Sequence, residues 1–286
     1  MNASSAHKRT RNICLIVALG GLLFGFDTAV ISGALEMLRN QFSLSTAMEG
    51  WMVSSGLAGC IIGVLGTSML SDRIGRKKTI LLSAIMFLVS AIGCAFPANV
   101  SQFIAFRIVG GIGVGMASVV SPMLIAEFAP ASQRGRMISY YQLAITVGIL
   151  AAYFSNALIV EVSAGDEKWR TMFLVMALPS ISFLLLLLRT PESPRWLVSK
   201  GRRSDALKVL LQLRQPDEAE QEFSAITNAS GRLKKNGRSL LHPAIRLPLF
   251  IGIVLAVFQQ FSGINAIIYY GPKIFEAASN NAGNNM

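Results

Sequence analysis

Long apolar blocks alternate with short polar segments along this chain. The blocks are roughly 18 to 25 residues long, which is about the length that a helix needs to cross a hydrocarbon layer near 30 Å thick. The pattern therefore predicts seven membrane-spanning helices, with bounds accurate to a few residues. The predicted spans are 13–35, 48–70, 79–96, 100–126, 137–160, 171–188 and 247–275.

A longer polar segment separates the sixth predicted span from the seventh. It covers residues 189–246 and contains a helix-like stretch from Arg203 to Leu213. We therefore expect an all-α membrane protein with three parts: a six-helix bundle over 1–188, a helical linker over 189–246, and a seventh helix within 247–286.

Composition supports a membrane protein and excludes an ordinary soluble domain. The 286 residues are 52% hydrophobic and only 14% charged, whereas soluble domains carry about 25% charged residues. Cys14, Cys60 and Cys94 lie in apolar blocks without CxxC or Cys/His spacing, so neither a metal site nor a disulfide framework is indicated. The block from Ile13 runs too far for a signal peptide, and we expect it to be retained as a helix.

The basic residues predict the orientation. The formal net charge of +11 could indicate nucleic acid, but the Lys and Arg residues lie in the polar segments between apolar blocks. If the N-terminus is inside, nearly all of them are inside, and the outside segments hold only Arg39, Lys168, Arg170 and Lys273. Positively charged short loops resist translocation. We therefore expect a cytoplasmic N-terminus and linker, a plasma or bacterial inner membrane location, and no nucleic-acid partner.

Small residues in the spans predict close helix packing rather than catalysis. Glycines such as Gly110, Gly111 and Gly113 let helix backbones approach where lipid offers no hydrophobic drive for association. The glycine-rich stretch from Arg107 to Gly115 could be mistaken for a phosphate loop, but it lacks the Lys-Ser/Thr ending and lies within a span. Without a metal-ligand cluster or nucleophile motif, we expect no enzymatic activity and no cofactor.

Two ionisable residues, Asp27 and Arg107, lie well inside predicted spans. Such residues are costly in lipid and are expected to face the bundle interior, each with a partner. Counted from span ends near Leu35 and Asn99, both lie about eight residues deep, roughly 12 Å at 1.5 Å per residue. Matching depth predicts that they pair. A fixed structural ion pair and a carboxylate that gains and loses a proton during transport both remain open.

Charges of both signs recur at helix ends on the predicted cytoplasmic side. Positive loops explain the Lys and Arg residues there, but leave Asp72, Glu127 and Glu192 unexplained. We interpret the set as a breakable salt-bridge network, a charge latch between two helix bundles, with solvated loops as the alternative. The predicted members of the charge latch are Asp72, Arg73, Arg76, Glu127, Arg134, Glu192 and Arg195.

Six motifs occur in order along nearly the whole chain. They are Gly20 to Asp27, Asp72 to Lys78, Arg107 to Gly111, Glu127 with Arg134-Gly135, Pro191 to Arg195, and Gln259 to Asn265. With them the chain resembles the sugar porter family of the major facilitator superfamily, which includes bacterial xylose, galactose and arabinose proton symporters and animal glucose facilitators. The resemblance implies two six-helix bundles, with sugar bound between them near the membrane middle and exposed alternately to each side.

The resemblance also implies a sugar site made of amides, which offer donors and an acceptor to hydroxyl groups. A packing role through interhelical hydrogen bonds is the alternative for the amide in the fifth span. Ile149 stands where the xylose symporter has a second amide, so the pocket is more similar to that of hexose transporters. The implied sugar-binding residues are Phe24, Gln142, Gln259, Gln260 and Asn265.

The family's proton symporters have aspartate and arginine at the positions of Asp27 and Arg107. The resemblance therefore favours transport of a monosaccharide or polyol with proton symport. Because the family has five further spans beyond the position of Met286, it also implies an incomplete second bundle: a fragment, a truncated product or one part of a split protein. A facilitator, an inactive transporter and a sugar-sensing membrane protein are the alternatives. The expected partners are a sugar, protons, the bilayer and a missing C-terminal half.

Overall fold

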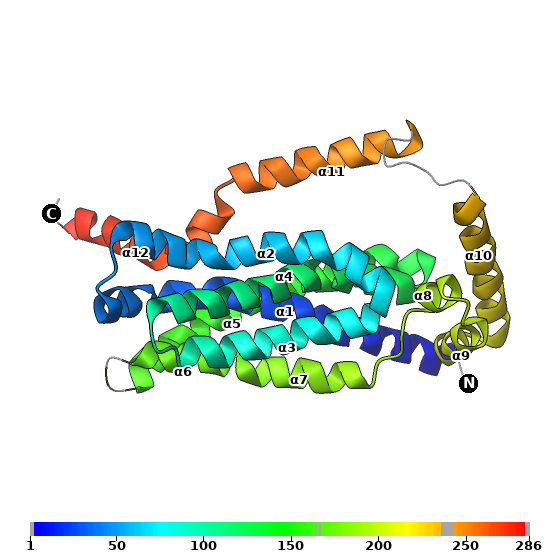
Figure 1. Ribbon diagram of the computed structural model, residues 1–286, viewed down its shortest axis with the longest axis horizontal. Coiled ribbons are helices and arrows are strands. Elements are labelled where there is room, and N and C mark those ends of the chain that lie inside the picture. Colours follow the sequence, from blue (N-terminus) through cyan, green and yellow to red (C-terminus); the bar gives the residue numbers. More distant parts are fainter. Residues whose placement is uncertain (1–2, 164, 166, 236–242, 284–286) are drawn as a thin grey trace. The chain divides into compact units, whose positions relative to one another are not determined.

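The computed structural model describes residues 3–163, 165, 167–235 and 243–283, and these residues form helices joined by short connections (Figure 1). No strand occurs among them. The helices are α1 (Ala3–Phe42), α2 (Thr46–Ile74), α3 (Arg76–Ala95), α4 (Val100–Phe128), the 3-10 turn η1 (Ala131–Gln133), α5 (Arg134–Val162), α6 (Lys168–Val175), α7 (Ala177–Leu188), α8 (Pro194–Ser199), α9 (Arg203–Leu213), α10 (Pro216–Lys235), α11 (Pro243–Phe261) and α12 (Ile264–Gly283).

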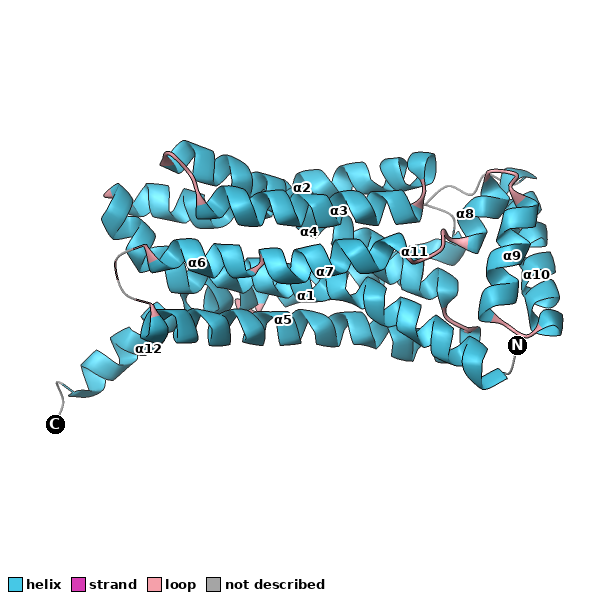
Figure 2. Ribbon diagram, turned by 90° about the horizontal axis from the view of Figure 1, so that it is seen from below, coloured by secondary structure: helices cyan, strands magenta, loops and turns pink. Residues whose placement is uncertain are grey.

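The chain divides into two units, Met1–Phe223 and Ser224–Met286. In the first unit, helices α1 to α7 lie lengthwise beside one another (Figures 1 and 2). Helix α2 packs along α4, α1 along α5, and α3 against α4. Helices α8 and α9 lie at the end of this bundle where α1 begins (Figure 1). The second unit contains the end of α10 together with α11 and α12.

Seven helical segments in the described part of the chain are long and apolar enough to cross a membrane. They include one segment for each predicted span, so the predicted number of spans and the all-α class are confirmed. The first segment, Ala6–Phe42, extends past both predicted ends, because a helix can continue through polar residues where it leaves the apolar layer. The fold is that of an integral membrane protein.

Two predicted spans are interrupted rather than continuous. The sixth changes from α6 to α7 at Met176, three residues before Pro179, which has no N–H to donate to the Val175 carbonyl one turn earlier. The seventh is divided between α11 and α12. There Gly263 adopts a φ of 73°, a left-handed conformation that glycine tolerates and most residues avoid.

Glycines bring α2 and α4 into backbone contact. A Cβ added at Gly59 of α2 would collide with the Ile108 carbonyl oxygen of α4, and one added at Gly111 of α4 would collide with the Gly56 carbonyl oxygen of α2. The approach is possible only because these residues lack side chains, as the small-residue pattern predicts for helices in lipid. The close α2–α4 contact holds α4, and with it Arg107, in a fixed place.

The linker helix predicted from Arg203 to Leu213 is confirmed, because α9 has the same bounds. Four of its apolar side chains are buried: Ala206, Val209, Leu210 and Leu213. Residues 236–242 of the predicted linker lie outside the described part of the chain.

Arg214, directly after α9, joins the linker to the bundle. Its side chain is buried and donates hydrogen bonds to the Phe128 carbonyl oxygen at the end of α4 (2.7 Å), to Oε2 of Glu222 in α10 (2.9 Å) and to Oγ1 of Thr10 in α1 (3.3 Å). In the sequence this arginine is one of the many basic residues of the linker that indicate the orientation. The contacts give it a structural role, in which it fixes α9 and the start of α10 against α1 and α4.

Replacing Arg214 with glutamine is expected to weaken the docking of α9 by about 1–3 kcal/mol, because the buried Phe128 carbonyl and the Glu222 carboxylate lose their partner. Hydrogen exchange of the backbone amides in α9, measured in detergent, checks this. Arg202→Gln is the control, since its ion pair with Asp205 is exposed and is worth little. Equal exchange in both variants would contradict the role of Arg214.

Candidate functional site

Asp27 of α1 and Arg107 of α4 form a buried ion pair in the first unit. Nη1 of Arg107 lies 3.0 Å from Oδ1 of Asp27 and also donates to the Asp27 main-chain oxygen at 3.2 Å. Asp27 is 3% exposed and Arg107 is 1% exposed. The two residues whose depths match in the sequence therefore meet directly, across two helices that also pack together.

Small residues from neighbouring helices make room for this pair. A Cβ at Gly56 of α2 would lie 2.9 Å from Nη2 of Arg107, and a Cβ at Gly110 of α4 would lie 3.3 Å from Oδ1 of Asp27. Ser90 of α3 also lies against Gly110. Helices α1, α2, α3 and α4 thus enclose two charges away from water, and each charge makes the other tolerable.

The fifth helix presents one polar residue that was predicted and one that was not. Gln142 is exposed on the surface of the first unit, and Phe24 of α1 is half-buried. Asn156 of α5 is buried, and its Nδ2 donates to the Val30 carbonyl oxygen of α1 at 3.0 Å. Asn156 is not among the residues predicted from the sequence, although an amide inside the predicted span 137–160 was the available signal. Its bond ties α5 to α1.

The remaining predicted amides lie in the second unit, on both sides of the break in the seventh span. Gln259 and Gln260 lie in the last turn of α11 and Asn265 in the first turn of α12. Nδ2 of Asn265 donates to Oε1 of Gln260 at 2.9 Å. Residues five apart are not neighbours on a continuous helix, where the spacing is three or four. The break at Gly263 therefore lets these two amides meet.

Part of the predicted charge latch is assembled within the first unit. Nη1 of Arg76 lies 2.8 Å from Oδ1 of Asp72, and its Nε lies 3.6 Å from Oε1 of Glu127. The Glu192 carboxylate accepts from the main-chain N–H of Lys77 at 3.1 and 3.2 Å. These contacts join the connection between α2 and α3 to the end of α4 and to the segment after α7.

The other predicted members of the charge latch form none of these ion pairs, although Arg195 interacts electrostatically with Glu127. Arg73 and Arg195 are exposed, and Arg134 is half-buried. Nε of Arg134 is buried and has no hydrogen-bond partner among the described residues. Trp196 is not among the predicted residues, but its Nε1 donates to the Asp72 carbonyl oxygen at 3.0 Å.

Residues 13–282 match the family described as "Sugar (and other) transporter". The chain belongs to this sugar transporter family. Among its curated relatives, the putative metabolite transport protein YfiG and the arabinose-proton symporter, both of Bacillus subtilis (strain 168), are each 44% identical to it, over 96% and 92% of this chain. The D-xylose-proton symporter of Escherichia coli (strain K12) is 38% identical over 93% of the chain. The family predicted from the six motifs is confirmed.

Solved structures of this sugar transporter family have the same fold. The proton:xylose symporter XylE bound to 6-bromo-6-deoxy-D-glucose is 37% identical, with a TM-score of 0.86 over 96% of this chain and 63% of that chain. The inward-open form of the xylose transporter XylE from E. coli gives a TM-score of 0.78. These relatives are transporters of the major facilitator superfamily. The chain spans 58% of the length of both B. subtilis relatives.

Proposed function

We propose that this chain forms the proton-coupling bundle and part of the sugar site of a sugar–proton symporter. The observation that carries the proposal is the buried Asp27–Arg107 ion pair. A charge in the interior of a membrane-spanning bundle is costly and is typical of proton pathways. Relatives named as arabinose-, galactose- and xylose-proton symporters support both the proton and the sugar.

The pair can act as a proton switch because its two states differ in charge. While Asp27 is ionised, its Oδ1 accepts from Arg107 and holds α1 to α4. A proton that binds the carboxylate removes its negative charge, so the electrostatic attraction to Arg107 is lost and α1 can shift relative to α4. Loss of the proton on the other side of the membrane restores the ion pair. Transport is coupled if sugar binding favours the protonated state.

The amides are proposed to bind the hydroxyl groups of a monosaccharide or polyol. Gln260 and Asn265 hydrogen-bond to each other, and each can exchange this bond for bonds to sugar hydroxyls, because an amide offers both a donor and an acceptor. Gln259 adds a third amide beside the same helix break, a position where discontinuous helices of transporters hold substrate. Gln142 and Phe24, in the first unit, are also proposed to bind the sugar, as the resemblance to sugar porters implies.

The proposed orientation places the N-terminus, the linker and the charge latch in the cytoplasm, at the plasma or bacterial inner membrane. The distribution of Lys and Arg supports it. Within the charge latch, Arg73, Arg134 and Arg195 make none of the ion pairs described above and are proposed to meet acidic residues of a second bundle. Opening and closing of these contacts would then accompany alternating access.

Asp27→Asn is expected to abolish sugar accumulation against a gradient while leaving sugar exchange, because a neutral amide cannot carry the proton. The chain is completed with the C-terminal part of the B. subtilis arabinose-proton symporter and reconstituted in proteoliposomes with an imposed pH gradient. The unsubstituted protein must accumulate sugar for the comparison to count. Glu36→Gln, at an exposed carboxylate of the same helix, is the matched control and should accumulate normally.

Continued accumulation by Asp27→Asn would remove Asp27 from the coupling mechanism. Uptake by the unsubstituted protein that ignores the pH gradient would favour a facilitator, in which the ion pair is only structural.

A further inference from the structure

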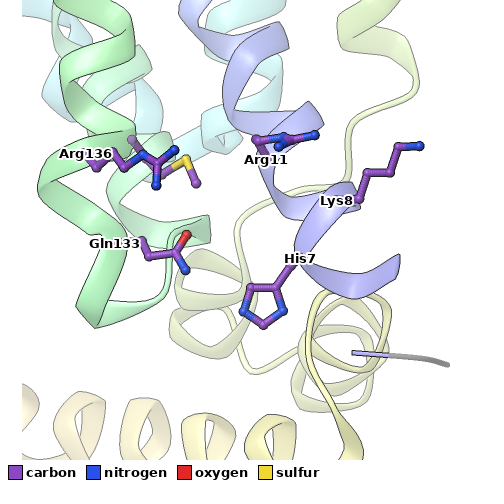
Figure 3. A pocket seen from close by; sticks show the side chains of 6 residues that line it. His7, Lys8, Arg11, Gln133 and Arg136 are labelled. Carbon is purple, nitrogen blue, oxygen red and sulfur yellow. The ribbon is translucent and has the colours of Figure 1, made fainter. Parts of the chain in front are cut away.

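A pocket of about 340 Å³ lies where α1 and α5 begin (Figure 3). None of the described residues that line it belongs to the Asp27–Arg107 ion pair. It lies entirely within the first unit. Its lining comes from three elements: the first turns of α1, the turn η1 and the start of α5. The lining residues are His7, Lys8, Arg11, Gln133, Arg136 and Met137.

The side chains of three of these residues converge. In Figure 3, His7 reaches from α1 toward Gln133, and the Gln133 amide and the Arg136 guanidinium extend from the opposite side toward α1. Nε of Arg136 donates to the Tyr140 hydroxyl at 3.2 Å, which orients the guanidinium. Lys8 and Arg11 extend from α1 away from α5 in the same view. They add charge at the rim, from side chains long enough to turn toward a ligand.

Among the described residues that line this pocket, every ionisable one is basic. Lys8, Arg11 and Arg136 bring cationic side chains, and the His7 imidazole adds a ring N–H donor. None of the described lining residues is acidic. The Arg136 guanidinium faces the pocket and Lys8 and Arg11 lie at its rim, so an anion bound in the pocket would be attracted by all three charges. Guanidinium and amide N–H groups together suit the oxygens of a phosphate.

The position of the pocket along both helices indicates where such a phosphate comes from. Arg11 lies two residues before the apolar block that starts at Ile13, and Arg136 lies directly before the apolar block that starts at Met137. The buried Met137 side chain also lines the pocket. The basic groups are therefore at the level where spans leave the apolar layer, which is the level of phospholipid headgroups. Basic pockets between helices at that level bind anionic headgroups.

We propose that this basic pocket binds the phosphate headgroup of an anionic phospholipid and thereby links the start of α5 to α1. The sugar site and the ion pair play no part in this binding, so the proposal stands independently of the proposed function. The acyl chains would lie along the exposed apolar side chains of the bundle, among which α5 contributes Leu143 and Leu150. A lipid held there would act on α1 and α5, two helices packed along each other.

The test measures lipid retention by native mass spectrometry of the purified chain in detergent. The chain is mixed with equal amounts of dioleoyl phosphatidylglycerol and dioleoyl phosphatidylcholine. We expect preferential retention of phosphatidylglycerol and a loss of roughly tenfold or more of that preference in the double variant Arg11→Gln with Arg136→Gln, because each basic group near the surface contributes about a factor of five. Both residues are exposed, so their replacement should leave the fold intact.

A matched double variant distinguishes lipid binding in this pocket from non-specific attraction of anionic lipid to the positive charge of the protein. Lys78→Gln with Arg189→Gln removes the same charge from exposed positions at other helix ends and should keep the preference. If both double variants lost the preference for phosphatidylglycerol equally, the total positive charge rather than this pocket would cause it, and the proposal would be overturned. No preference in the unsubstituted chain would also overturn it. In a competition experiment, glycerol 3-phosphate is added as a soluble phosphate ester. If micromolar concentrations displaced phosphatidylglycerol completely, the pocket would be a site for a free phosphate ester, and the proposal that its ligand is a lipid would be overturned.

Discussion

Arg107→Ala is expected to lower the free energy of unfolding by about 3–5 kcal/mol, because it leaves the Asp27 carboxylate buried without its cation. Asp27 is only 3% exposed, so water cannot replace the lost guanidinium. The carboxylate must either remain charged in the interior or take up a proton, and both outcomes cost free energy. The loss is measured as a shift of the unfolding transition in detergent, followed by the fluorescence of Trp169, which is fully buried.

The double variant Asp27→Asn with Arg107→Gln is the decisive comparison. It removes both charges and keeps amides that can hydrogen-bond across α1 and α4. We expect it to recover most of the stability lost in Arg107→Ala, since removal of a whole buried ion pair is often close to neutral. A double variant as unstable as Arg107→Ala would show that packing of the arginine side chain, rather than its charge, stabilises the bundle.

Gly59→Ala is expected to destabilise the bundle by about 3 kcal/mol, at the upper end of the usual cost of overpacking. The added methyl group would collide with the Ile108 carbonyl oxygen, which belongs to the backbone of α4 and cannot rotate away. Helices α2 and α4 would have to separate, and Arg107 in α4 would move with them. The same unfolding measurement reports the loss of stability, because weaker contact between α2 and α4 makes the protein unfold under milder conditions.

Gly66→Ala on the same helix is the matched control, because nothing lies within 4 Å of a Cβ added there. Alanine also has the higher helix propensity, so this variant should unfold at or slightly above the transition of the unsubstituted protein. If Gly66→Ala destabilised the protein as much as Gly59→Ala, the close α2–α4 approach would not be the cause.

Much of the fold follows from patterns that are local in the sequence. Apolar blocks of membrane-spanning length predicted the seven spans, and the stretch from Arg203 to Leu213 predicted a helix with the bounds that α9 has. Matching depth predicted that Asp27 and Arg107 pair. These predictions succeeded because length, periodicity and the cost of a charge in lipid act on each segment by itself.

Other features depend on how helices rotate and pack, which no single segment determines. The Gln260–Asn265 bond needs the break at Gly263, and a glycine in an apolar block can equally continue a helix. Arg214 could not be distinguished in the sequence from the other basic residues of the linker, because its partners lie on α1, α4 and α10.

The sequence by itself thus determined the number of spans, the buried ion pair and the family, because the apolar layer constrains each helix separately. Only the tertiary structure decided which side chains meet at the ends of the helices, in the Arg214 contacts and in the basic pocket beside Arg136. Outside the apolar layer water can solvate a charge, so a charged side chain need not pair with an opposite charge as it must in lipid. Its partners there are set by the packing of helices that lie far apart in the chain.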